Sequence, residues 1–242
     1  MTFSELIQRE QEWEGEQRAL VEAVFDCGDY WGAAIGALDL GLSEELPPLL
    51  WRRWTAGAMT LDQLREAIPS IWIHNRSPVP PIGERSWLAM FKAAGFLSQV
   101  AEVVGKPSRY ATELAETRPT RPLVVWRGAS LDSNGRGFSW TQYQECGQGF
   151  AQAWADVYQR ASGLYRAEVP GRAVLAIFGD DREQEVVVNP NMLKGRVELV
   201  ATISTGETDD AAELLPKAET NSLCVDCGID TARESCQVAR SR

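Results

Sequence analysis

Three short groups of residues have the types and spacing that chemistry on a sugar or a phosphate would need. The first is Arg127, which follows the apolar run at residues 123–126; its planar guanidinium suits bidentate binding of a phosphate or a carboxylate. Gly128, directly after it, would let a ligand approach the backbone closely. Taken alone, Arg127 favours a simpler interpretation, an edge-strand arginine in an ordinary ion pair.

The second and third groups are pairs of residues separated by one position. Ser139 and Thr141 flank Trp140, and strand side chains alternate, so both hydroxyls would share one face while the indole takes the other. Glu183 and Glu185 place two carboxylates on one face at the start of an apolar run. Such a pair suits glycosidic chemistry, in which one carboxylate stabilises an oxocarbenium-like sugar and the other activates the nucleophile. The alternatives are solvated strand residues and a solvated acidic turn.

Other motifs of catalysis are missing from the sequence. His74 is the only histidine, and a lone histidine is more often a hydrogen-bonded packing residue than part of a Ser-His-Asp set. No GxxxxGK[ST] loop is present, and the glycines at 147 and 149 do not make a dinucleotide fingerprint. Cys224, Cys227 and Cys236 supply three of the four ligands of a structural zinc site. We therefore favour a loose tail with free thiols and expect no metal.

The composition narrows the classes of partner. The chain has 242 residues, with 24 lysines and arginines against 34 aspartates and glutamates, and a net charge of −10. That sign disfavours general attraction to nucleic-acid backbones and to anionic membranes. No apolar run is long enough to cross a membrane, and no signal segment is visible. We expect a soluble protein of the cytoplasm, of either the producing cell or a host cell.

The elements that must position these residues fall into three regions. Residues 1–118 are acidic, tryptophan-rich and helical in pattern. A helix is expected over residues 3–25, and a capping box at Thr60–Gln63 opens a second helix that Pro69 should close. The proline-rich stretch 76–83 predicts a loop. A helical face around Trp87 follows and ends at Gly95.

Residues 119–203 change to the pattern of short strands. Strands are predicted over 123–128, 137–141, 164–169, 173–178, 183–188 and 196–202, with one helix over 144–159. This arrangement predicts a compact, mostly antiparallel sheet, and the chain as a whole is expected to be α+β. Residues 204–242 are polar and acidic without a pattern, and we expect disorder there with a short helix at best.

The order of the three groups resembles the R-S-E class of mono-ADP-ribosyltransferases, specifically the small bacterial and phage members. An arginine on a first strand, Ser-x-Thr on a second and Glu-x-Glu entering a later strand occur here in that order, within residues 121–202. The resemblance implies a β-sandwich catalytic core after the helical region, and NAD as the substrate. Within this class, the Glu183-x-Glu185 motif of this chain is similar to the Glu-x-Glu motif of the members that modify arginine.

The resemblance also implies a role for each matching residue. Arg127 would hold the phosphates and the nicotinamide ribose side of NAD, and the Gly128 backbone would bond the nicotinamide amide. Phe150 would pack against the nicotinamide ring. Glu185 would bond the ribose hydroxyl and stabilise the cation formed as nicotinamide leaves, while Glu183 would orient and activate the acceptor. The strand residues have supporting roles: Ser139 would brace the catalytic glutamate, with Trp140 and Thr141 shaping the strand.

This chain departs from the related proteins at Gly147 and Gly149, which stand in the helix after Ser-x-Thr where those proteins carry an alanine and a bulky residue. Each glycine should weaken the helix by about 1 kcal/mol relative to alanine, and the pair could loosen or enlarge the nicotinamide wall.

The expected activity is transfer of ADP-ribose from NAD to an arginine or another macromolecular acceptor, with release of nicotinamide. A protein target is favoured over a nucleic-acid target because of the net charge. NAD glycohydrolysis on the same core is one alternative, and a non-catalytic acidic interaction protein is another. Residues 1–118 would either buttress the NAD cleft or select the target, and the oligomeric state stays open.

Overall fold

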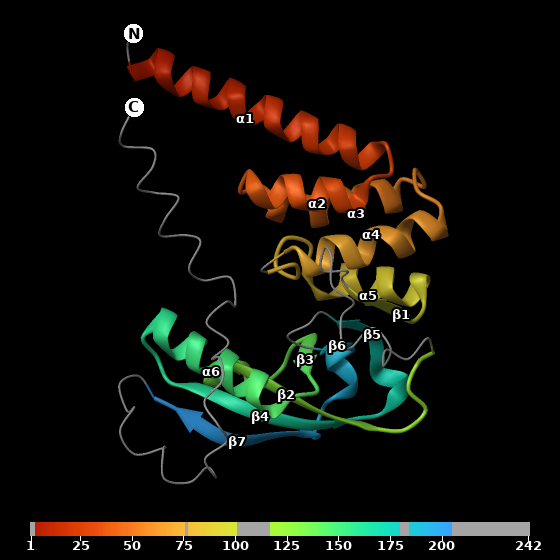
Figure 1. The fold of residues 1–242 in the computed structure, drawn as a ribbon, viewed down its shortest axis with the longest axis vertical. Coiled ribbons are helices and arrows are strands. Elements are labelled where there is room, and N and C mark those ends of the chain that lie inside the picture. Colours follow the sequence, from red (N-terminus) through yellow and green to blue (C-terminus); the bar gives the residue numbers. More distant parts are fainter. Residues whose placement is uncertain (1–2, 76, 101–116, 180–183, 205–242) are drawn as a thin grey trace.

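In the computed structural model, which describes residues 3–75, 77–100, 117–179 and 184–204, helices from the N-terminal half stack over a β-sheet (Figure 1). The α-helices are α1 (Phe3–Asp26), α2 (Tyr30–Asp39), α3 (Leu46–Thr55), α4 (Leu61–Ile73), α5 (Gly83–Ala94) and α6 (Gln144–Tyr158). The strands are β1 (Leu97–Val100), β2 (Leu123–Ser130), β3 (Ser139–Thr141), β4 (Ser162–Val169), β5 (Val174–Gly179), β6 (Gln184–Val188) and β7 (Val197–Ile203). The expected α+β class, with helices ahead of a sheet, is confirmed.

Helix α4 begins as predicted and ends later than predicted. The Thr60 hydroxyl accepts from Gln63 N at 3.2 Å, and the Gln63 side chain accepts from Thr60 N at 2.8 Å, which completes the capping box. Pro69 lies inside the helix, so the expectation that it closes the helix is wrong. A mid-helix proline costs about 3 kcal/mol. Burial of its neighbours Ile68 and Ile71 against the core offsets that cost and carries the helix to Ile73.

The strands form a seven-stranded sheet within the described residues, in the order β1-β5-β6-β3-β2-β4-β7. Strand β1 runs parallel to β5, and the other neighbouring strands are antiparallel. The prediction of a mostly antiparallel sandwich is therefore matched only in part, because one mixed sheet joins all the strands. Strand β1 was missed since its four residues lie within the region predicted to be helical.

One hydrophobic core joins the helices to the sheet. Buried side chains of the helices, among them Ile68 and Phe91, belong to the same cluster as Leu175, Phe178 and Val187 of β5 and β6. Strand β1 precedes residue 118 and pairs with β5, which follows it, and the cluster also contains residues from both sides of this boundary. The predicted regions 1–118 and 119–203 therefore share a sheet and a core. The predicted region 204–242 lies outside the described residues except for residue 204.

The apolar run of β6 is explained by burial on both faces. Val187 packs in the core under the helices, whereas Val186 and Val188 pack in a second core with Val125 and Val174. Strands buried on both faces need continuous apolar runs rather than alternation. The position of Glu185 on β6 follows, since it shares the face of Val187 and turns toward the helices.

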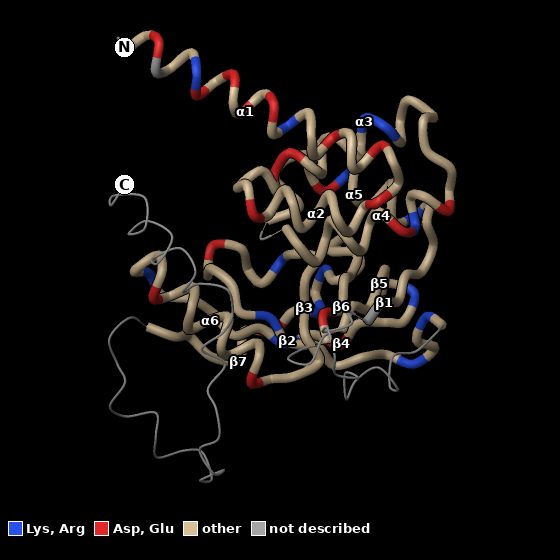
Figure 2. The backbone as a smooth tube through the Cα atoms, turned by 45° about the horizontal axis from the view of Figure 1, so that its top comes forward, with Lys and Arg blue, Asp and Glu red and all other residues tan. Residues whose placement is uncertain are grey.

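Helix α1 projects beyond the other helices and carries acidic side chains along its length (Figures 1 and 2). Its Trp13 is 56% exposed. Within the described residues, none of the helices combines the length and the apolar character needed to cross a bilayer.

Candidate active site

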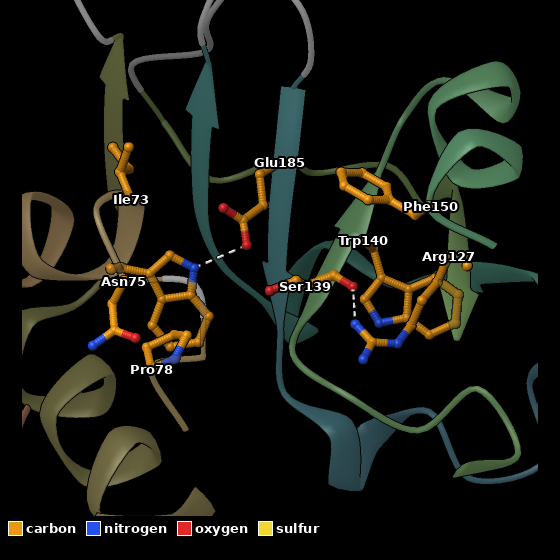
Figure 3. A pocket seen from close by; sticks show the side chains of 10 residues that line it. Ile73, Asn75, Pro78, Arg127, Ser139, Trp140, Phe150 and Glu185 are labelled. Carbon is orange, nitrogen blue, oxygen red and sulfur yellow. Dashed lines mark hydrogen bonds between the residues drawn. The ribbon is translucent and has the colours of Figure 1, made fainter. Parts of the chain in front are cut away.

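A cavity of about 250 Å³ lies where the helices meet the middle of the sheet (Figure 3). The predicted site residues that line it are Arg127, Gly128, Ser139, Trp140, Phe150 and Glu185. They come from β2, β3, α6 and β6, so the fold brings together groups that are far apart in the sequence. Thr141 is buried and does not line the cavity. Glu183 lies outside the described residues.

The pairing of β3 with β6 sets the faces of the central residues. Thr141 pairs with Glu185 and Ser139 with Val187, so these side chains share the face toward the helices. Trp140 points into the opposite core, and its Nε1–H donates to Gly137 O at 3.0 Å. The predicted alternation along residues 139–141 is therefore confirmed. The Thr141 hydroxyl accepts from Tyr143 N at 3.2 Å, which ties it to the turn that leads into α6.

Arg127 holds a buried guanidinium with bonding capacity to spare. One terminal N–H donates to the backbone carbonyl of Ser139. Its buried Nε has no hydrogen-bond partner among the described residues. Burial lowers the pKa of Arg127, and the negative charge of Glu185 opposes that effect. A guanidinium that is desolvated and incompletely bonded is a strong donor to an anionic or polar ligand.

Gly137 makes the room that this guanidinium occupies. A Cβ at position 137 would lie 2.6 Å from both Cζ and Nη2 of Arg127. Any larger residue there would displace the charged end of the side chain. The glycine before Ser-x-Thr therefore belongs to the site, although it was not among the predicted site residues.

The packing of α6 requires a glycine at position 128, in addition to any close approach of a ligand. A Cβ at position 128 would lie 2.0 Å from Ala151 N and 2.6 Å from Phe150 C, so the backbone of α6 occupies the space beside it. Gly147 lies on the α6 side of this contact between α6 and β2, since a Cβ at position 147 would lie 2.9 Å from the Cβ of Trp126. Gly147 therefore allows α6 to pack against β2, whereas Gly149 faces open space.

Close packing of α6 also presents Phe150 to the cavity. Its side chain is 38% exposed and forms part of the wall near Arg127 and Gly128 (Figure 3). An exposed aromatic ring in a concave site offers a flat apolar surface on which a planar ring can stack.

Glu185 receives a hydrogen bond from a residue that sequence reasoning missed. The Trp72 Nε1–H of α4 donates to Glu185 Oε1 at 2.9 Å. Figure 3 shows the Glu185 carboxylate directed toward the helical side of the cavity, where Asn75 and Pro78 lie. The helical region thus forms one wall of the cavity. No local pattern distinguishes Trp72 from the other tryptophans, because its partner is far along the chain.

His74 is a packing residue, as predicted. Its Nδ1 lies 2.7 Å from Ser70 O, and its ring meets the Trp31 ring edge-on at 4.3 Å. The described residues contain no group of three or more histidine, cysteine, aspartate or glutamate side chains that could hold a metal ion. Cys224, Cys227 and Cys236 lie outside those residues.

Comparison of the chain with models of protein families, with curated proteins and with solved structures finds no match. The cavity and its side chains are therefore the basis for assigning a function.

Proposed function

We propose that this chain is a mono-ADP-ribosyltransferase that transfers ADP-ribose from NAD to an arginine or another macromolecular acceptor, with release of nicotinamide. One observation carries the proposal: Arg127, Ser139, Phe150 and Glu185 line one cavity. Their order along the chain is that of the R-S-E class, and their side chains include the cation, the aromatic ring and the carboxylate that NAD cleavage needs.

The transfer breaks the bond between C1′ of the ribose and the nicotinamide nitrogen. Nicotinamide leaves as a neutral molecule with the bonding electron pair, and positive charge develops on the ribose. The Glu185 carboxylate stabilises that charge more strongly in the transition state than in bound NAD, which is the condition for acceleration. An acceptor nitrogen then bonds to C1′ and gives up a proton, for which the resemblance implies Glu183.

The remaining groups bind the dinucleotide. The Arg127 guanidinium pairs with its phosphates, and Phe150 stacks on the nicotinamide ring. Ligand pockets usually measure about 300–1,000 Å³, and this cavity of about 250 Å³ is smaller. It therefore encloses the nicotinamide-ribose end, and the adenosine end lies outside it.

Release of nicotinamide by the wild type and by Glu185→Gln tests the proposal, with and without cell lysate and with agmatine as a small guanidino acceptor. We expect acceptor-stimulated release by the wild type and loss of at least about 100-fold in the variant, as for removal of a transition-state charge partner. Glu198→Gln is the matched control, because that carboxylate is 67% exposed and lies 3.7 Å from Arg166 on the surface.

The remaining outcomes identify the alternatives. Release that needs no acceptor would make the chain an NAD glycohydrolase. Label that survives nuclease but not protease treatment of the lysate would establish a protein target, and the reverse would establish a nucleic acid. A folded protein that neither binds nor cleaves NAD would contradict the proposal and leave an acidic interaction protein.

A further inference from the structure

The contact between Trp72 and Glu185 joins the helical region to the carboxylate at the centre of the sheet. Its length is 2.9 Å between Nε1 and Oε1, and its two residues lie 113 positions apart. An indole nitrogen can donate and cannot accept. The bond therefore occupies one carboxylate oxygen and orients the plane of the group.

Trp72 is held rigidly enough to fix that plane. Its side chain is 3% exposed. Three rings surround it edge-on: Trp87 at 4.9 Å, Phe91 at 5.3 Å and Phe138 at 5.8 Å between centroids. Such edge-to-face contacts are favourable in themselves and leave a side chain in a packed core little freedom to change rotamer. The N–H direction is thus set by the core and not by the carboxylate.

We infer that Trp72 is a positioning residue for Glu185, an inference that rests on the proposed function. A carboxylate that stabilises a developing cation works best when it is oriented before the reaction, because no free energy is then spent on turning it. Hydrogen bonds to an ionised acceptor are about twice as strong as neutral ones. Trp72 therefore aligns Glu185 from the wall of the cavity, and the helical region takes part in the chemical step through it.

The test compares Trp72→Phe with Trp87→Phe in the nicotinamide-release assay. Both changes remove an indole from the same cluster, but the Trp87 N–H donates to Pro78 O at 2.7 Å and not to Glu185. We expect Trp72→Phe to lower kcat by about 10- to 100-fold, the effect of one lost hydrogen bond to a charged group. KM for NAD, and the Kd of NAD from titration calorimetry, should stay within about twofold, because the bond matters in the transition state. Trp87→Phe keeps an aromatic ring beside Trp72 and leaves the Trp72–Glu185 bond in place, so its loss of kcat should be clearly smaller than that of Trp72→Phe.

A double-mutant cycle separates positioning from general support. Glu185→Asp shortens the side chain, which withdraws the carboxylate from the indole and keeps its charge. If Trp72 acts through Glu185, Trp72→Phe adds little loss of kcat in the Glu185→Asp background. A loss as large as in the wild-type background would refute the positioning role.

The outcomes distinguish this inference from the proposed function. A folded wild type that releases no nicotinamide overturns both, whereas an active wild type with undiminished or increased kcat in Trp72→Phe overturns only the role of Trp72. If Trp72→Phe does not fold by urea titration, benzothienylalanine at position 72 replaces it. That side chain has the shape of tryptophan with sulfur in place of the N–H, and the same fall in kcat is required of it.

Discussion

The close packing of α6 on β2 predicts a large loss of stability for Gly128→Ala. The new Cβ would meet three backbone atoms, Ala151 N at 2.0 Å, Gly147 O at 2.5 Å and Phe150 C at 2.6 Å. Ordinary contact begins at 3.4 Å, so helix and strand would have to separate by about 1.4 Å at the closest point. Backbone atoms cannot move aside as the end of a side chain can.

The cost follows from that separation. Overpacking of a core with one methyl group usually costs about 1–3 kcal/mol, and occasionally more. We expect at least about 3 kcal/mol for Gly128→Ala, because the helix itself must move, out of a total of about 5–15 kcal/mol for a typical protein. The measurement is the free energy of unfolding from urea titration followed by far-UV circular dichroism.

Gly149→Ala is the matched control. Gly149 lies on α6, the helix that packs against Gly128 of β2, and a Cβ there meets nothing within 4 Å. Alanine is favoured over glycine in a helix by about 1 kcal/mol, so this variant should be more stable than the wild type by up to that amount. The explanation of Gly128 would be refuted if Gly128→Ala were as stable as the wild type, or if both alanines changed stability in the same direction.

Two further predictions concern the charged groups. Gly137→Ala should raise KM for NAD by about tenfold, because its Cβ would lie 2.6 Å from Arg127 Cζ and displace the guanidinium that we propose binds the phosphates of NAD; an unchanged KM would contradict this account of Gly137. The hydrogen bond from Arg53 holds the pKa of Asp26 below its ordinary value of 3.8, so the interaction stabilises the fold above pH 3.8 and is lost as the pH falls through the lowered pKa. Asp26→Asn should therefore cost about 0.2–1 kcal/mol at pH 7, the range for an exposed ion pair, and nothing at low pH; urea titrations at both pH values measure it, and an equal cost at both would refute the assignment.

Much of the site could be predicted because local patterns determine it. Arg127 follows an apolar run that becomes β2, and Glu185 opens the apolar run of β6. Alternation along a strand then fixes the face of each side chain, as it does for Ser139 and Trp140. These are short-range properties, and they required only that the strands be recognised.

The features that were missed depend on residues far away in the sequence. Nothing near Trp72 indicates Glu185 as its partner, since the shared core decides which indole reaches the sheet. Strand β1 pairs in parallel with β5, with Leu97 opposite Ala176. Its four residues are too few to show the alternation that predicts a strand. Pro69 has the local signal of a helix end, and burial of the residues around it prevails over that signal.

The parallel pairing of β1 with β5 and the Trp72–Glu185 bond have a consequence for how the chain folds during synthesis. The helices α1 to α5 are complete by Ala94, but β1 finds its partner only when β5 has been made, and Glu185 follows later still. Contacts between distant segments form slowly because a long loop must close first. A ribosome-bound chain that has released only its helical half therefore lacks the cavity, so the proposed NAD cleavage would begin only after β6 has emerged and joined the sheet.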